Sequence, residues 1–258
     1  QIFETKLGGR PVWRVIVTHM HPDHIGNAGW LTRKFPGAEL WITRLEYLTC
    51  RSLGSDTGRE APEAGIRFFR AAGWNDDQIE TYRQRFGGFG RAVSALPDSF
   101  HRLEDTMSFE MAGQSWRVII GNGHSPEHAC LHCEDLNVLI SGDQLLPRIS
   151  SNVSVHPTEP TANPLDDWIT SCEKLRDNIP EDVLVLPAHN LPFKGAHERL
   201  DHLIYGHEIS LKRLHQRLEE GPKRVVDVFV SIFGRKIEDD VVSMATGEAI
   251  AHLNYLIA

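Results

Sequence analysis

The stretch Thr18-His-Met-His-Pro-Asp-His24 places three histidines and one aspartate within seven residues. It follows Val12-Trp-Arg-Val-Ile-Val17, an apolar run with the composition of a buried strand. The polar side chains therefore stand at the C-terminal end of a strand, where α/β proteins build their sites. On a tight turn, His19 and His21 point to the same side by the two-residue period of an extended chain, and the Asp-His pair that follows faces a neighbouring position.

Three more candidate metal ligands, His124, Asp143 and His189, occur later in the chain. Each follows a run with strand composition, at residues 116–120, 138–141 and 183–186. Each ligand group therefore stands just beyond the end of a strand, which is the placement that converging ligands require.

Five histidines and two aspartates together have the donor chemistry of a two-metal site. Zinc accepts imidazole nitrogen and carboxylate oxygen, and iron or manganese also bind such mixed sets. We predict two divalent ions, zinc by preference. Their ligands would be His19, His21 and His124 for one ion, Asp23, His24 and His189 for the other, and Asp143 as the bridge. Because two such ions can generate a nucleophile from water and polarise a carbonyl or phosphoryl oxygen, both aspartates are also predicted to be catalytic.

The run His19-Met-His-Pro-Asp-His24, followed in order by His124, Asp143 and His189, resembles the metallo-β-lactamase superfamily. All seven ligand positions of the superfamily have a matching residue here. The resemblance covers roughly residues 12–195 and implies an αββα sandwich with a dinuclear metal site at one edge.

Gly123-His-Ser-Pro-Glu-His128 is similar to the Gly-His-Thr-x-Gly-His stretch of glyoxalase II, one branch of that superfamily. This similarity implies that His124 is a metal ligand. His128 is then expected either to orient a ligand through a hydrogen bond or to be a structural histidine. The resemblance is specific for fold and metal and leaves the substrate open.

Two parts of the chain depart from the strand pattern. Residues 45–103 are predicted to form a helical insertion beside the metal site, with helices at 63–72 and after the N-cap residue Asn75. Residues 196–258 are predicted to form a small, mainly helical C-terminal module, similar in layout to the winged-helix-like module of some β-lactamase-like thioesterases and nucleases. The catalytic domain would then span residues 1–195.

The superfamily fold opens with several strands ahead of its first helix, whereas this chain begins almost at that helix, with a helix end predicted at residues 2–7. Either the sequence starts late or part of the N-terminal half-sheet is missing. Exposed apolar sheet surface is then expected to make the protein self-associate.

Composition excludes several classes of protein. The 258 residues are 41% hydrophobic and carry a formal net charge of −8, which disfavours nucleic acid because non-specific binding depends on Lys and Arg. No apolar run approaches the roughly 20 residues of a membrane span and no signal segment opens the chain, so a cytoplasmic protein is expected. Four cysteines are too few for a disulfide framework, and Cys130 and Cys133 are expected to pack within a strand.

The leading hypothesis for function is hydrolysis of a small activated acyl compound, a thioester or ester of the hydroxyacylglutathione or acyl-CoA type. Phosphodiester or RNA cleavage, lactone hydrolysis and a non-catalytic, metal-stabilised binding protein are the alternatives. Candidates for substrate contact are Tyr82, Phe86, Phe89, Arg91 and Arg148. Arg148 follows the predicted bridging aspartate closely enough for its guanidinium to meet a carboxylate or phosphate.

Overall fold

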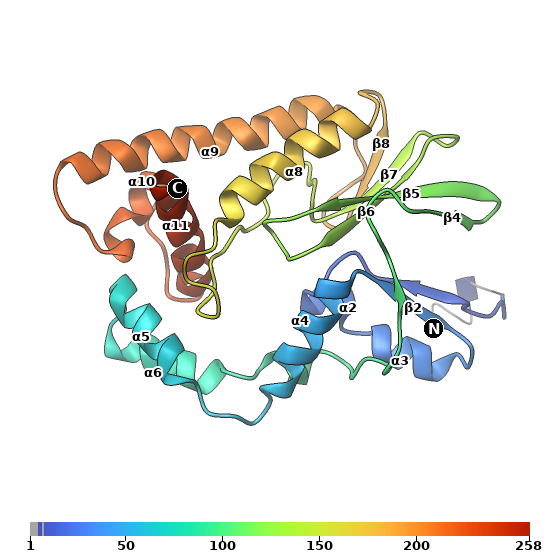
Figure 1. Ribbon diagram of the computed structural model, residues 1–258, viewed down its shortest axis with the longest axis horizontal. Coiled ribbons are helices and arrows are strands. Elements are labelled where there is room, and N and C mark those ends of the chain that lie inside the picture. The colour runs from blue at the N-terminus through green and yellow to red at the C-terminus, as the bar shows by residue number, and fades with distance from the viewer. Residues whose placement is uncertain (1–4, 7) are drawn as a thin grey trace.

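The computed structural model describes residues 5, 6 and 8–258, and its strands form two sheets (Figure 1). The helix end predicted at residues 2–7 lies largely outside the described residues. The first sheet is parallel and contains β1 (Arg14–Ile16), β2 (Glu39–Ile42) and β3 (His101–Arg102). The second contains β4 (Ser108–Met111), β5 (Gln114–Gly121), β6 (His128–Cys133), β7 (Val138–Gly142) and β8 (Leu184–Pro187). Its pairs are antiparallel except β7 with β8.

The helices fall into three groups along the chain. The first two follow β1 and are α2 (Pro22–Ile25) and α3 (Ala28–Lys34). Between β2 and β3 lie α4 (Arg44–Ser55), α5 (Glu63–Ala72), α6 (Asp76–Arg85) and α7 (Phe89–Ala92). The last group is α8 (Pro164–Asn178), α9 (Ala196–Glu219), the 3-10 helix η1 (Val225–Val228), α10 (Phe229–Phe233) and α11 (Val242–Ile257). In Figure 1, α8 and α9 cover the outer side of the five-stranded sheet, and α3 covers the outer side of the other.

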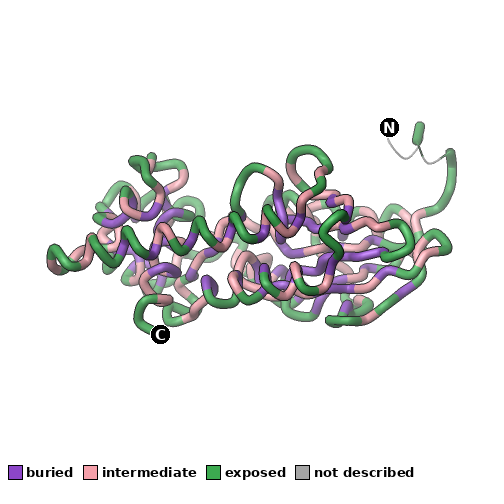
Figure 2. Tube along the Cα trace, turned by 90° about the horizontal axis from the view of Figure 1, so that it is seen from above, coloured by how far each residue is buried: buried purple, intermediate pink, exposed green. Residues whose placement is uncertain are grey.

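Burial follows the strands and the inward faces of the long helices (Figure 2). Along β5 and β6, alternate residues face opposite sides of the sheet. Val118 and Leu131 belong to the core between the two sheets, whereas Ile119 and Cys130 face α8. This arrangement confirms the predicted αββα sandwich, with three strands in the N-terminal sheet among the residues that the structure describes.

Cys130 and Cys133 illustrate the same alternation. A spacing of three residues sends their side chains to opposite faces of β6, and the two cysteines lie in different cores. All four cysteines of the chain are buried and unpaired. Both residues of the Cys-x-x-Cys therefore pack in the interior, as expected.

The insertion is helical, but only part of it lies at the predicted metal site. Helices α5 and α6 pack against the C-terminal helices, and the Trp74 indole donates a 2.8 Å hydrogen bond to Thr246 on α11. Asn75 caps α6 through a capping box with Gln78, as its position predicts. One correction concerns the end of the insertion, because His101–Arg102 forms strand β3 beside β2.

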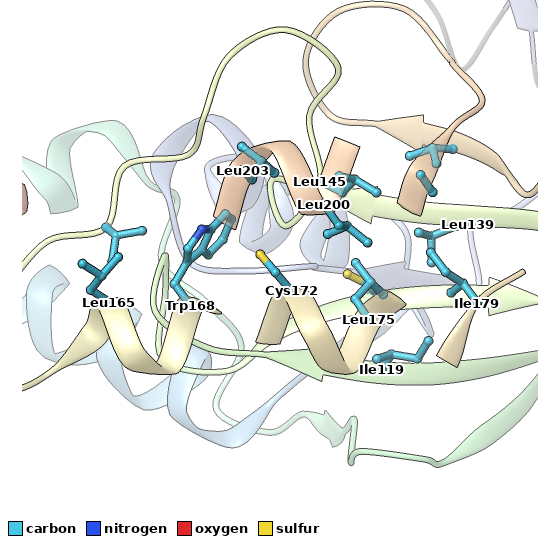
Figure 3. Close-up of a cluster of buried hydrophobic side chains, with 14 of the residues drawn as sticks. Ile119, Leu139, Leu145, Leu165, Trp168, Cys172, Leu175, Ile179, Leu200 and Leu203 are labelled. Carbon is cyan, nitrogen blue, oxygen red and sulfur yellow. The ribbon is translucent and has the colours of Figure 1, made fainter. Parts of the chain in front are cut away.

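Residues 196–258 are helical, and the structure describes no strand within them. Helix α9 shares a core with α8, where Leu200 and Leu203 pack in one cluster with Trp168 and Leu175 (Figure 3). Packing is thus continuous across the predicted domain boundary at residue 195. The boundary itself stays a prediction.

Apolar surface is exposed at one end of the three-stranded sheet, where the Trp13 side chain next to β1 is 69% exposed. Within the described residues, strand β1 is an edge strand of this sheet, and exposed apolar surface beside an edge strand favours association between molecules. Self-association of this protein stays a prediction. Among the described helices, none combines the length and apolar character needed to cross a lipid bilayer.

Candidate metal centre

The predicted ligands come from the ends of four strands at one edge of the sandwich. The first group follows β1, where Pro22 starts α2 and turns the chain directly after His21. The carbonyl of Thr18 accepts a 2.8 Å hydrogen bond from the amide of Ala129 at the start of β6, which ties the two sheets together at this edge. His124 precedes β6, and the remaining two ligands follow β7 and β8.

The structure brings all seven predicted ligands together. Three groups have ligand atoms within 4.8 Å of one another: His19, His21 and His124; His19, His24 and Asp143; and Asp23, His24 and His189. The first and third groups match the two triads expected from the sequence. The second places Asp143 between them, as a bridging ligand requires. The assignment of each ligand to an ion stays a prediction.

Distances around Asp143 fit metal coordination better than direct hydrogen bonding. Its Oδ2 lies 3.4 Å from His24 Nε2 and 3.5 Å from His124 Nε2, and its Oδ1 lies 3.5 Å from His189 Nε2. Direct hydrogen bonds of this kind are about 2.7–3.2 Å long. Two ligands bound to a tetrahedral zinc at about 2.0–2.1 Å lie roughly 3.3 Å apart.

Four buried ligand atoms of the cluster have no hydrogen-bond partner among the described residues. The buried atoms without a hydrogen bond include His19 Nε2, His24 Nε2, His124 Nε2 and Asp143 Oδ1. Buried polar atoms are almost always satisfied in folded proteins, so several orphaned lone pairs facing one point indicate a missing partner. The donor set and its orientation therefore fit divalent metal ions.

Burial favours the neutral form of His19, His21 and His128. Burial also acts to lower the pKa of His24, but the carboxylates of Asp143 and Asp23 outweigh it and raise that pKa in the absence of metal. Burial, reinforced by the neighbouring imidazoles, holds the pKa of His19 far below its usual value. Burial and the nearby His124 lower the pKa of His21 to about 4 and that of His128 to about 3. Burial alone would raise the pKa of Asp143, but the imidazoles of His124 and His24 hold it well below its usual range. Neutral imidazoles and an ionised carboxylate are the forms that bind metal.

His128 supports Asp143, the predicted bridging ligand. Its Nε2 accepts a 3.0 Å hydrogen bond from the amide of Asp143, and its ring stacks on His19 with centroids 4.7 Å apart. Gly142 allows this close approach, because a Cβ there would lie 2.5 Å from His128 Nε2, and its φ of +51° suits glycine. His128 is thus a partner of the ligands and orients Asp143 through its main chain.

Sequence reasoning missed Glu46, a fully buried carboxylate on α4. It accepts hydrogen bonds from Met20 N at 2.8 Å, Ser125 Oγ at 2.6 Å and Glu127 N at 2.8 Å. The Glu127 carboxylate in turn accepts a 2.8 Å hydrogen bond from Leu45 N at the start of α4. This reciprocal clamp joins the two loops that carry His19, His21 and His124. The sequence offered one indication that Glu46 is buried: it lies four residues before Cys50, on the same face of α4.

The cluster opens to solvent on one side, where the Asp23 side chain is 59% exposed and that of His189 is 42% exposed. Their ligand atoms, Asp23 Oδ2 and His189 Nε2, are 3.3 Å apart. The exposed Arg148 lies on the segment that follows the bridging aspartate. A substrate can therefore approach the cluster from the Asp23 side.

The other candidates for substrate contact lie on the insertion. Tyr82 packs against Phe69 with ring centroids 4.8 Å apart and, with Trp74 and Val242, lines a pocket of about 340 Å³ between α6 and α11. The Phe86 ring centroid is 5.9 Å from that of Tyr82. Figure 1 shows α5 and α6 under the C-terminal helices, away from the strand ends that carry the histidines.

Phe89 and Arg91 are on the short helix α7. The Phe89 side chain is partly buried against the core of the N-terminal sheet, and Arg91 is exposed. A substrate role for these residues of the insertion stays a prediction.

An αββα sandwich that gathers histidines and aspartates at one edge is the architecture of a metal-binding hydrolase. The chain belongs to the metallo-β-lactamase superfamily, because the model of that superfamily matches residues 1–189. A model described as metallo-β-lactamase-like, C-terminal domain, matches residues 211–258. No match was found among curated proteins.

Solved structures agree with this membership. A β-lactamase domain protein from Burkholderia ambifaria is 36% identical, with a TM-score of 0.89, over 99% of this chain and 72% of that one. A metallo-β-lactamase family protein from Thermus thermophilus is 28% identical, with a TM-score of 0.75, over 95% and 74%. The B3 metallo-β-lactamase BLEG-1 is 18% identical, with a TM-score of 0.51, over 79% and 81%, and shows the fold alone.

Proposed function

We propose that this protein is a zinc-dependent hydrolase that cleaves a small activated acyl compound, a thioester or an ester. One observation carries the metal dependence: the buried Nε2 atoms of His19, His24 and His124 gather beside Asp143 without a hydrogen-bond partner in the described part of the chain. When bound, two divalent ions at such a cluster make water a nucleophile at neutral pH and polarise a carbonyl oxygen.

The chain's own residues would prepare this site in distinct ways. Two hydrogen bonds hold the main chain of Asp143. Its amide donates to His128 Nε2, and its carbonyl accepts from the Ser151 hydroxyl. The main chain of Asp143 is therefore held in place, which restricts the positions that its carboxylate can take. Asp23 is the more exposed of the two catalytic candidates and lies where the substrate would enter.

Two observations support an acyl substrate over a nucleic acid. Gly123-His-Ser-Pro-Glu-His128 is similar to the glyoxalase II stretch, although Glu127 stands where that stretch has glycine. The formal net charge of −8 would repel a nucleic-acid backbone. Both observations fit a thioester substrate, such as a hydroxyacylglutathione or an acyl-CoA. The enzyme would act in the cytoplasm.

The test is a set of initial hydrolysis rates for the zinc-loaded protein. The panel contains acyl-CoA and glutathione thioesters, a simple ester, a lactone, a β-lactam and a single-stranded RNA. We expect thioester or ester turnover that is lost in Asp143→Ala, with metal content measured for both proteins. Circular dichroism shows that the variant is folded.

Turnover of RNA alone would overturn the acyl proposal and favour the phosphodiesterase alternative. Turnover of the lactone or β-lactam alone would keep metal-dependent hydrolysis and replace the substrate class. Full metal loading without turnover of any substrate in the panel would favour the non-catalytic binding protein.

A further inference from the structure

We infer that Glu248, on the C-terminal helix α11, is a positioning residue for the metal centre that acts on His124 through Asn152. The inference rests on the proposed function only in treating His124 and Asp143 as metal ligands. It gives the C-terminal region a role in the site that neither the ligand motif nor the family match assigns.

The segment after β7 touches two ligands at once. The carbonyl of Asn152 accepts a 2.8 Å hydrogen bond from Nδ1 of His124. Because Nδ1 carries the proton, Nε2 of His124 has a free lone pair, and that atom is the one that faces the cluster. The neighbouring Ser151 hydroxyl donates to the main-chain carbonyl of Asp143. Movement of this segment would disturb both ligands.

The same segment is fixed to α11. The side-chain amide of Asn152 donates a 2.7 Å hydrogen bond to Glu248 Oε2, and Ser154 Oγ donates a 2.6 Å bond to Asn152 Oδ1. One residue further, the Val155 amide donates to the carbonyl of Gly247 at 3.0 Å. These contacts join residues 152–155 to one turn of the helix.

Helix α11 and residues 152–155 pack too closely to admit a side chain at Gly247. A Cβ at Gly247 would lie 2.6 Å from Ser154 Oγ and 3.0 Å from the carbonyl oxygen of Val155. Glycine is thus needed for helix and segment to approach this closely. Burial raises the pKa of Glu248 to about 7, and its carboxyl can accept the Asn152 hydrogen bond in either protonation state.

A hydrogen bond that orients a ligand is usually worth about 10–100-fold in metal affinity or activity. Glu248→Ala removes the closer acceptor of the Asn152 side-chain amide, at 2.7 Å, and leaves the carbonyl of Met244 at 3.4 Å. The Asn152 carbonyl that holds His124 therefore loses much of its support. Glu248→Gln keeps an uncharged acceptor of the same length. We therefore expect about tenfold or greater loss of zinc affinity in Glu248→Ala and substantial recovery in Glu248→Gln.

The experiment measures zinc affinity of the full chain by competition with a chromophoric chelator, and the absorption spectrum of the cobalt(II)-substituted protein. Glu208→Ala, an exposed glutamate on α9, is the matched control and should bind zinc as the wild type does. Asn152→Ala provides a second route to the same loss. In the double variant Asn152→Ala/Glu248→Ala, the losses of zinc affinity should not add, because both substitutions remove the same hydrogen bond between Asn152 and Glu248.

Wild-type zinc affinity and an unchanged cobalt spectrum in Glu248→Ala and Asn152→Ala would overturn the inference. So would additive losses, or a Gln variant as weak as the Ala variant, since either result removes the hydrogen-bond route. If Glu248→Ala does not fold, Asn152→Ala and Glu248→Gln decide alone. Failure of the proposed function is distinct, because it is read from wild-type turnover and not from the relative affinities of the variants.

Discussion

At the scale of single residues, Glu46 is the side chain on which the geometry of the ligand loops most depends. Its carboxylate is buried and accepts from Met20 N, Ser125 Oγ and Glu127 N. Glu46→Ala leaves two buried donors and one partly buried donor without this acceptor, and each unsatisfied buried donor costs about 1–3 kcal/mol. We expect the free energy of unfolding, measured with urea, to fall by about 3 kcal/mol or more.

Exposed Glu208 again supplies the comparison, since surface substitutions usually change stability by about 0.5 kcal/mol or less. If Glu46→Ala unfolds at the same urea concentration as Glu208→Ala, the clamp has no energetic role. The metal-free protein is the right material, because bound metal would add a stabilising contribution of its own.

The same scale shows why some site residues could be predicted and others could not. Four of the predicted ligands share one seven-residue stretch, and the other three follow recognisable strands, so spacing and strand context together could predict them. Glu46 and Glu248 act on residues 79 and 96 positions away. Nothing local marks such pairs, because only the folded chain brings a carboxylate on a helix next to a distant loop.

At the scale of the elements, two helical glycines should respond oppositely to alanine. Gly206 lies within α9 with no atom close to the position of an added Cβ, so Gly206→Ala should stabilise by about 0.5–1 kcal/mol. Gly29 lies in α3, where a Cβ would overlap the carbonyl oxygen of Ala95. Gly29→Ala should therefore lower the melting temperature while Gly206→Ala raises it. Changes of the same sign would contradict this account.

The α9–α11 contact should make stability depend on pH through His207. Its Nδ1 lies 3.2 Å from Nε2 of His252, and burial, reinforced by His252, lowers the pKa of His207 to about 3. Between about pH 3 and 6.5 the unfolded chain binds a proton that the folded chain does not, so the unfolding free energy falls as the pH drops. His207→Leu should reduce this slope by up to about 1.4 kcal/mol per pH unit.

The measurement is urea unfolding from pH 4 to 7 on metal-free protein. The other buried histidines contribute to the slope of every variant, so the difference from wild type is the informative quantity. His202→Leu, at an exposed position on the same helix, is the control and should change the slope far less. Equal slopes for wild type and His207→Leu would rule out this source of pH dependence.

Hydrophobic patterns along the chain predicted most helices and strands, but they did not predict every element against which each of these packs. The helix predicted at 63–72 has the predicted bounds. Strand β3 was missed because two residues carry no periodicity. The contact of α5 and α6 with the C-terminal helices was missed because an apolar helix face shows that something covers it, not what covers it.

At the scale of the whole molecule, the αββα architecture could be predicted because the ligand motif of a known family covers most of the chain. The contact between the C-terminal region and the metal site could not be predicted from the sequence. It depends on hydrogen bonds between two segments that are far apart in sequence, Asn152 with Glu248 and Val155 with Gly247.

Metal binding should stabilise the entire sandwich, because its ligands come from strands of both sheets and converge only in the folded state. Zinc at a free concentration about 100 times its dissociation constant should contribute about 2.7 kcal/mol. In a chain of this size that corresponds to a rise of roughly 5–10 °C in melting temperature, reversed by a chelator. Asp143→Ala should show a much smaller rise, because the loss of the bridge weakens both triads. An equal rise in Asp143→Ala would place the stabilising zinc elsewhere on this histidine-rich chain, and no rise in the wild type would contradict a metal centre at these residues.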